Sequence, residues 1–211
     1  MRGRLQVLEC NSLLHLYYPE TYFTKCALCN HPFDTVPHIL NGCTRFNLAY
    51  QKRHNRVVDL IFEKVKNSNK NIEVIKDCII KPSMFIESDI NSFISSNVRP
   101  DIVTIDRNIK NVKIIEFSSP FDGYLKRCYQ NKFDKYMPLS LEIGELDYST
   151  TIVILLIGSL GNVHYRFISG LLKVGITKTE AKFLAQYCST SVVIGSFQIW
   201  KSRCNKLNSI V

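Results

Sequence analysis

The pattern of apolar and polar positions divides the chain into segments of helical and strand character. Apolar residues recur every three or four positions over 46–66, which predicts a helix about 30 Å long at 1.5 Å per residue. The polar run NSNKN at 67–71 ends that helix, and IEVIKDCII at 72–80 predicts a strand that Pro82 terminates. Residues 1–24 favour a short helix followed by a loop, and the pattern over 83–98 is ambiguous.

The second half of the chain predicts three more strands and several helices. Strands are expected over 101–106 and 112–118, joined by a tight polar turn. Asp122 is a candidate N-cap for a helix that runs to about residue 136 and ends before Pro138. The apolar run TTIVILLIGS at 150–159 is typical of a strand buried on both faces. Thr177 and Glu180 have the spacing of a capping box that opens a C-terminal helix, with a second helix near 190–206.

The order of the central elements is therefore helix, strand, strand, strand, helix, strand. This order predicts an α/β fold in which helices flank a central mixed sheet. We expect three parts along the chain: an N-terminal segment of residues 1–45, a core of residues 46–160, and a basic helical segment of residues 161–211 that packs on the core.

Composition excludes several classes of protein. The 211 residues are 45% hydrophobic and 21% charged, which is typical of a folded chain rather than a disordered one. The longest apolar run, 151–160, is about half of a bilayer span, so no transmembrane helix is expected. The N-terminal segment has no continuous apolar stretch that would serve as a signal peptide. We therefore expect an intracellular protein whose eight cysteines are thiols or metal ligands.

The charge is positive overall and unevenly distributed. Lysine and arginine number 27 against 18 acidic residues, an excess that fits a polyanionic partner but is shared by ribosomal, nucleosomal and membrane-surface proteins. Residues 1–70 carry 10 basic and 5 acidic side chains, and residues 161–211 carry 7 and 1. Residues 71–160 carry 10 and 12. A basic rim around a centre that keeps its carboxylates suits a metal-dependent enzyme acting on nucleic acid, although an uneven solvated surface gives the same counts.

The segment CALCNHPFDTVPHILNGC contains a candidate zinc site. Cys26, Cys29, His38 and Cys43 have the spacing C-x2-C-x8-H-x4-C, and zinc favours four such ligands in a tetrahedron. His31 is a possible competing ligand, but its position two residues after Cys29 would crowd the turn. Buried thiols beside a loop histidine are the alternative. The remaining cysteines lack metal-ligand spacing and are expected to be mainly core thiols: Cys10, Cys78, Cys128, Cys188 and Cys204.

Two acidic residues are expected on one face of the hairpin formed by 101–106 and 112–118. With the turn centred between residues 108 and 109, paired residue numbers sum to 217, so Asp101 lies opposite Glu116. Directly opposed residues have Cβ atoms roughly 4.5–5.5 Å apart, and two carboxylates at that distance repel unless a cation lies between them. Magnesium or manganese would meet that need. A register shift of one residue would separate the acids.

A lysine occupies the centre of an apolar stripe on the following helix. At 100° per residue Lys132 lies between Tyr129 and Tyr136, where burial is costly unless the ammonium is paired. The two carboxylates are the obvious partners, and Lys135 lies nearer the edge of the stripe. The alternative is that Lys132 extends along its aromatic neighbours to reach solvent. Two acids, a divalent metal and a lysine together suit phosphodiester hydrolysis.

The cysteine–histidine spacing, taken with the segments RHN at 53–55, RPD at 99–101, Glu116 and KFDKY at 132–136, resembles the C-terminal end of site-specific non-LTR retrotransposon proteins. In that family a CCHC zinc knuckle precedes a restriction-like endonuclease of the PD-(D/E)XK superfamily, which has an αβββαβ core. The resemblance covers about residues 20–205, including IGSLG at 157–161 and IW-x-x-R at 199–203.

The resemblance implies a DNA endonuclease whose nick primes reverse transcription by an upstream reverse transcriptase domain, which is absent from this chain. It implies that Asp101 and Glu116 hold catalytic magnesium or manganese, and that zinc in the knuckle is structural. Ser118 stands where the superfamily pattern has its lysine. The retrotransposon branch carries the lysine on the next helix, which suits Lys132, with Lys135 as the second candidate.

The expected nucleic-acid contacts follow from the same motifs. Arg53, Arg56 and Arg99 are expected to bind backbone phosphates, with His54 or Asn55 near the active site. For His54 a partly buried, hydrogen-bonded role is the alternative. The expected partners are DNA and element RNA, with no membrane, and the expected location is the nucleus. The competing functions are a non-catalytic zinc-containing module that binds nucleic acid on an inactive nuclease scaffold, and a purely structural zinc protein.

Overall fold

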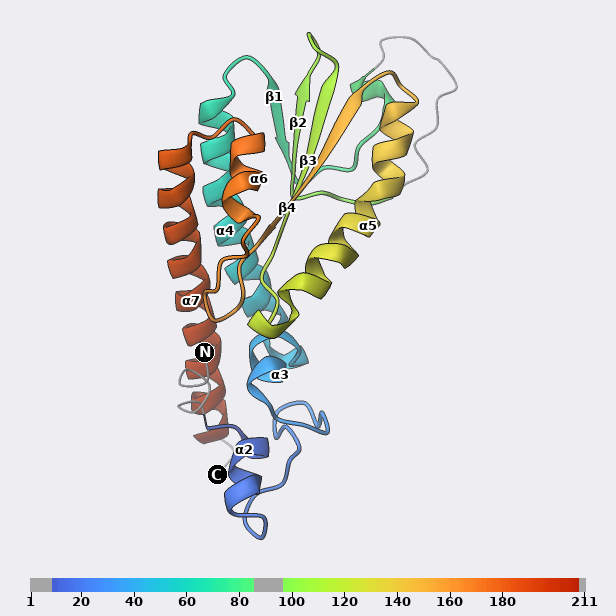
Figure 1. Ribbon diagram of the computed structural model, residues 1–211. Helices are drawn as coiled ribbons and strands as arrows, with labels where there is room; N and C mark the ends of the chain where they lie inside the picture. Colours follow the sequence, from blue (N-terminus) through green and yellow to red (C-terminus); the bar gives the residue numbers. More distant parts are fainter. Residues whose placement is uncertain (1–8, 86–96, 209–211) are drawn as a thin grey trace.

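The structure is a computed structural model that describes residues 9–85 and 97–208, so residues 1–8 of the expected N-terminal helix lie outside the described residues. The described residues form an α/β fold in which helices cover both faces of a four-stranded sheet (Figure 1). The predicted fold class and the order of its central elements are confirmed. Within the two described ranges, no helix combines the length and the apolar character needed to cross a membrane.

The sheet is mixed and follows the chain in the order β1-β2-β3-β4. The first three strands are antiparallel neighbours, whereas β4 runs parallel to β3. The predicted hairpin register is confirmed, since Val103 pairs with Ile114 and Ile105 with Val112. The strand bounds are β1 Glu73–Lys76, β2 Ile102–Asp106, β3 Asn111–Ser118 and β4 Ser149–Leu156.

Strand β1 is shorter than the nine residues predicted over 72–80. Asp77 directly follows it with φ of 58°, a left-handed conformation that turns the chain out of the sheet. The backbone N–H of Asp77 still donates to the carbonyl of Asp101, so the two segments remain side by side beyond the end of the strand.

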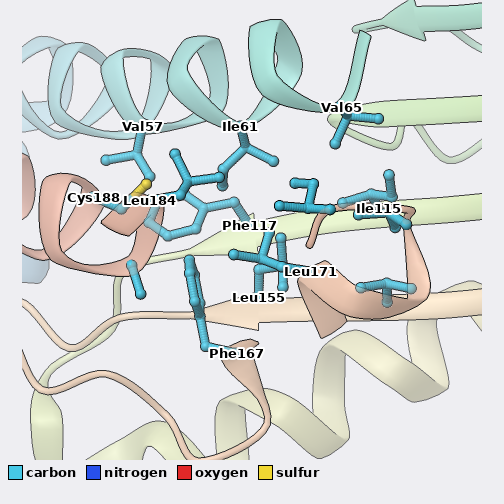
Figure 2. Packing of buried hydrophobic residues seen from close by; sticks show 14 of the residues in the cluster. Val57, Ile61, Val65, Ile115, Phe117, Leu155, Phe167, Leu171, Leu184 and Cys188 are labelled. Carbon is cyan, nitrogen blue, oxygen red and sulfur yellow. The ribbon is translucent and has the colours of Figure 1, made fainter. Parts of the chain in front are cut away.

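Alternation along the strands builds a separate apolar cluster on each face of the sheet. Ile115 and Phe117 of β3 pack against α4 (Asn47–Ser68), α6 (Phe167–Lys173) and α7 (Lys178–Asn208). Figure 2 shows this side of the core, where Phe117 lies among side chains of α4, α6 and α7. The intervening residues, such as Ile114, pack against α5 (Leu125–Gly144) on the opposite face.

Helix α5 departs from its predicted bounds at both ends. It continues through Pro138, because Leu139 and Ile143 beyond the proline are fully buried in the core and this burial outweighs one lost backbone hydrogen bond. Asp122 is not its N-cap, since a 3-10 turn over Asp122–Tyr124 precedes the helix. The carboxylate of Asp122 instead accepts hydrogen bonds from the backbone N–H groups of Leu160 and Asn162.

Helix α7 is one continuous helix of 31 residues rather than the two predicted. The expected capping box is present, since the Thr177 hydroxyl accepts from the backbone N–H of Glu180 at 3.4 Å and a Glu180 carboxylate oxygen accepts from the backbone N–H of Thr177 at 3.3 Å. Gly195 does not break the helix. A side chain there would lie 2.7 Å from Cγ of Arg53, so glycine permits α4 and α7 to approach closely. The far end of α7 extends past the sheet and packs on the N-terminal region (Figure 1).

The N-terminal region consists of α2 (Asn11–Tyr17), α3 (Val36–Asn41) and the turns between them. Its small apolar cluster includes Ile39 and Phe46, together with Ile199 of α7. A buried ion pair joins the same two parts of the chain, because Arg203 of α7 contacts the carboxylate of Asp34. Burial therefore anchors this region on the last turns of α7.

Candidate active site and candidate metal centre

Polar side chains from four elements meet where the apolar core reaches the start of β2. Asp101 directly precedes β2 and Glu116 lies in β3, while His54 projects from α4 and Lys132 from α5. The sequence separations are large, so only the folded sheet brings the four groups together. Two of these groups are acidic and two are basic.

Glu116 is the buried centre of one half of this site, with only 3% of its surface exposed. Its Oε1 atom lies 2.5 Å from Nζ of Lys132, and its Oε2 accepts a hydrogen bond of 2.6 Å from the Tyr136 hydroxyl. Lys132 therefore points inward to Glu116, and the alternative in which it extends to solvent along its aromatic neighbours is not adopted. Tyr136 is fully buried, so its hydroxyl fixes the carboxylate from the core side.

Asp101 forms the other half. Its Oδ1 atom lies 3.0 Å from Nε2 of His54, and its Oδ2 accepts a 2.7 Å hydrogen bond from the backbone N–H of Phe117. Since Phe117 follows Glu116 in β3, this bond holds the Asp101 carboxylate beside the second acid. His54 is partly buried and hydrogen-bonded, as one interpretation predicts, and it also lies beside the candidate active site, as the other predicts.

Neighbouring carboxylates raise the pKa of both basic groups, against the effect of burial. Burial alone would lower the pKa of His54, but its hydrogen bond to Asp101 and the charges of Asp101 and Glu116 raise the pKa above its ordinary value. Burial likewise opposes the charge of Lys132, yet Glu116 raises its pKa. Burial, reinforced by Glu116, raises the pKa of Tyr136, so its hydroxyl remains a donor.

The donor set fits a divalent metal with hard oxygen ligands. A carboxylate offers about four lone-pair sites, and the contacts described above use one at each oxygen of Asp101 and Glu116. Capacity therefore remains on both carboxylates, and magnesium and manganese prefer such oxygen ligands with water completing the shell. Lys132 and His54 contact the same two carboxylates, and the Lys132 ammonium offsets the charge of Glu116.

The predicted phosphate contacts are distributed between the interior and the surface. Arg53, which is predicted to contact phosphate, is buried: it is 5% exposed and donates to Ser196 Oγ at 2.7 Å and to the Ser119 carbonyl. It shares its helix face with Val57, which packs against α7, and that face is turned inward. Asn55 and Arg56 lie on the exposed face of α4.

Arg53 nevertheless lies next to the site. It lines a cavity of about 420 Å³ together with His54 and Ser118. Its Nε atom has no hydrogen-bond partner among the described residues, and burial lowers its pKa to about 10. The cavity therefore has a cation in its wall that no carboxylate neutralises among its described lining residues.

The other two predicted cations flank the site from its outer side. Arg99 is exposed and donates from Nε to the carbonyl of Asp77 at 2.7 Å. Lys135 lies beside Lys132 on α5 but contacts a different group, since its Nζ is 3.1 Å from the Tyr136 hydroxyl. Of the two candidate lysines, Lys132 contacts a site carboxylate directly and Lys135 reaches it through Tyr136.

Sequence reasoning missed two features of the site. The first is the hydrogen bond from Tyr136 to Glu116, although the position of Tyr136 four residues after Lys132 places both on one helix face. That spacing was the signal in the sequence that could have placed Tyr136 in the site. The pairing of His54 with Asp101 had none, because 47 residues separate them and the contact depends on how α4 packs on the sheet.

The predicted zinc ligands converge in the N-terminal region. One ligand atom from each of Cys26, Cys29, His38 and Cys43 lies within 4.8 Å of the others, and Cys29 Sγ is 3.2 Å from His38 Nε2. Zinc–sulfur bonds of about 2.3 Å in a tetrahedron place ligand atoms about 3.8 Å apart, so this cluster could hold a metal such as zinc. His31 stays outside it and stacks on His38 with ring centroids 4.2 Å apart.

Neighbouring groups fix the cluster against α4. The Tyr50 hydroxyl donates to the carbonyl of Ile39 at 2.7 Å and accepts from the backbone N–H of Cys43 at 3.0 Å. Thr35 caps α3 by accepting from the backbone N–H of His38. Burial raises the pKa of Cys26 to about 12, so a cation bound there must displace the thiol proton.

Comparison with known proteins adds one structural likeness. No protein-family model matches the chain, and a search of the curated proteins gave no match. Among solved structures, the chain is similar to an N-terminal domain of a reptarenavirus L protein, with 17% sequence identity and a TM-score of 0.33 over 72% of this chain and 92% of that chain. A likeness of this size leaves the function to be argued from the residues of the chain itself.

Proposed function

We propose that this protein is a metal-dependent DNA endonuclease with a restriction-like core, of the kind that follows a zinc knuckle in site-specific non-LTR retrotransposon proteins. One observation carries the proposal: Asp101, Glu116 and an inward-pointing lysine, Lys132, meet at one place although they come from three separate elements. The proposed partner is DNA, with element RNA second, and the proposed location is the nucleus.

Each residue has a role in the proposed reaction. Asp101 and Glu116 would hold magnesium or manganese, which when bound supplies an activated water and polarises the scissile phosphate. Lys132 keeps its proton beside Glu116 and offsets negative charge that develops on the phosphate. His54 and Tyr136 hold the two carboxylates in place, and both are positioning residues.

A DNA strand must approach the site from its solvent-exposed side. Arg99 is exposed there, and Arg56 is exposed on α4, so both can contact backbone phosphates. The zinc knuckle packs on α4 and α7 rather than on the sheet. In this proposal zinc is structural and takes no part in hydrolysis.

A non-catalytic module that binds nucleic acid is the second candidate. One observation favours it, namely that all four carboxylate oxygens of Asp101 and Glu116 already have partners within the chain. A closed network of this kind also occurs as a purely structural element of a core. Nucleic-acid binding without cleavage would then be the whole activity.

Plasmid nicking in the presence of magnesium separates the two candidates. Asp101→Asn is expected to slow nicking by at least roughly 100-fold, because it removes one of two charged metal ligands. Asp106→Asn is the matched control: it makes the same change at the other end of β2, where the carboxylate accepts from the backbone N–H groups of Asn108 and Ile109 and lies outside the candidate active site. Equal rates for wild type and Asp101→Asn would refute the proposed function.

The same assay assigns the lysine. Lys132→Met is expected to reduce nicking more than Lys135→Met, since Lys132 contacts Glu116 directly. The reverse order would transfer the catalytic role to Lys135. If neither variant nor Asp101→Asn changes nicking while salt-dependent DNA binding persists, the non-catalytic module is the better description.

A further inference from the structure

A group of aromatic and basic side chains lies outside the candidate active site, between α5 and the loop from β4 to α6. We define the tyrosine–arginine platform as Tyr129, His164, Tyr165 and Arg166. The ring centroids of Tyr129 and His164 are 5.4 Å apart at 21°, and those of His164 and Tyr165 are 4.4 Å apart. The guanidinium carbon of Arg166 lies 4.8 Å from the Tyr129 centroid and 5.4 Å from that of Tyr165.

The outer part of the platform faces solvent. Tyr165 is 77% exposed and Arg166 is also exposed, while Tyr129 is half-buried against the core. A tyrosine ring stabilises a fold mainly through the apolar area that it buries. Tyr165 buries little, so its ring remains available to a ligand.

The loop that carries Tyr165 and Arg166 is held firmly. The carboxylate of Asp122 accepts from the backbone N–H groups of Leu160 and Asn162 at 2.7 and 3.1 Å. A Cβ at Gly158 would lie 2.4 Å from Cγ of Asp122, so glycine is needed for this approach. A platform held in place before binding loses less entropy when a ligand stacks on it.

Positive charge surrounds the platform. Two adjoining cavities of about 510 and 330 Å³ share Tyr129, Tyr165 and Arg166 in their walls. None of the described residues that line these two cavities is acidic. The basic residues that line them are Lys126, Arg127, Arg166 and Lys173.

We propose that the tyrosine–arginine platform binds single-stranded nucleic acid, with bases stacked on the exposed ring of Tyr165 and phosphates on the surrounding cations. Exposed aromatic rings within a basic groove are the combination that binds unpaired strands, because every base offers a flat face and every linkage a negative charge. In a duplex those faces are already stacked on one another. The platform shares no residue with the candidate active site, so this binding goes beyond the proposed function and does not require cleavage.

Binding of a short fluorescent DNA strand to the full chain, in magnesium-free buffer without chelator, tests the proposal. Tyr165→Ala is expected to weaken binding roughly 5- to 100-fold through lost stacking. Arg166→Gln is expected to make the salt dependence shallower by about 0.7 in logarithmic slope. The matched control is Tyr187→Ala, which removes a similarly exposed tyrosine from α7, outside both cavities, and should bind as the wild type does.

An abasic strand of equal length separates stacking from charge alone. It should bind more weakly than the normal strand, and Tyr165→Ala should make no further difference to it. An RNA strand of the same sequence shows which nucleic acid is preferred. Loss of affinity in Tyr165→Ala for either the DNA or the RNA strand supports the proposed site. Equal affinity of Tyr165→Ala and wild type for the normal strand would overturn the proposal.

The outcome is separable from that of the proposed nuclease. Asp101→Asn should keep full affinity for the single strand, whatever its effect on nicking. A wild-type protein that binds the strand through Tyr165 but does not nick plasmid would count against the nuclease alone. Nicking with no contribution of Tyr165 to strand binding would count against the platform alone.

Discussion

The sheet region, formed by β1–β4 and the helices that flank them, and the knuckle region, formed by residues 9–46, are stabilised by different kinds of interaction. The sheet lies between two apolar clusters whose members, such as Phe117 and Leu139, are fully buried. The knuckle region has one small cluster, in which the buried thiols of Cys26 and Cys43 take part, and a buried ion pair between Asp34 and Arg203. Apolar contacts are numerous and individually replaceable, whereas a metal centre or an ion pair fails when one partner is lost.

The largest expected effect is that of removing the zinc proposed for the cysteine–histidine cluster. Structural zinc contributes about 10–16 kcal/mol in isolated zinc-finger peptides, so a chelator or Cys29→Ser should unfold the knuckle. Hydrogen exchange of residues 26–43 should then become fast while that of 102–118 stays slow. Cys204→Ser is the control, because Cys204 lies outside the cluster and should keep the metal content of the wild type. Slow exchange of 26–43 after complete metal removal would contradict this view.

Removal of one partner of the buried ion pair should be the next largest effect. Asp34→Ala leaves the Arg203 guanidinium buried without its counter-charge, which costs about 3–5 kcal/mol in comparable cases. Urea unfolding measures the loss. Replacing both residues in Asp34→Ala/Arg203→Met should recover much of it, and a single variant as stable as the wild type would show that the pair is dispensable.

A cavity created by substitution in the sheet region should lower the free energy of unfolding without affecting the knuckle region. Ile61→Ala in α4 removes a fully buried side chain from the larger cluster and should cost about 2–5 kcal/mol, with metal content unchanged. Leu60→Ala, one residue earlier and partly exposed, should change the free energy of unfolding by much less. Loss of metal in Ile61→Ala would show that the two regions are coupled more tightly than their contacts suggest.

The smallest effect concerns pH at the start of α7. Lys64 and then Thr177 lower the pKa of Glu180 from its ordinary value of 4.5 to about 2. Because the folded-state pKa is the lower one, the pair stabilises the fold above pH 4.5 and this contribution is lost as pH falls from 4.5 towards 2. Lys64→Met should flatten the dependence of stability on pH over that interval. Glu63, the neighbouring acid on α4, provides the control Glu63→Gln, which should leave it intact.

Most of the fold could be predicted because its periodic signals are local. The hairpin register followed from the turn between 108 and 109, and the capping box from the spacing of Thr177 and Glu180. The bounds of α5 and α7 could not be predicted, because burial of Leu139 and Ile143 and the fit of Gly195 against Arg53 depend on neighbouring elements. These are tertiary effects that override local propensity.

Parts of the candidate site could be predicted where one local sequence pattern, a hairpin or a helical stripe, contained the residues concerned. The two carboxylates followed from the hairpin, and the inward direction of Lys132 from its place in an apolar stripe. The burial of Arg53 was missed, since a helix repeat does not show which of its faces a distant helix will cover. The tyrosine–arginine platform was missed for a similar reason, because Tyr129 and Tyr165 come from different elements.

The continuous helix α7 also fixes how far the N-terminal region lies from the sheet, and at what rotation about the helix axis. At 1.5 Å per residue its 31 residues measure about 46 Å. Within this helix, Gly195 packs on Arg53 of α4, and Arg203 further along is paired with Asp34 of the N-terminal region. One residue inserted between these two contacts would rotate the distal end by about 100° and point Arg203 away from its partner. Relatives of this protein should therefore vary freely in their surface loops, yet keep the number of residues in this stretch of helix constant.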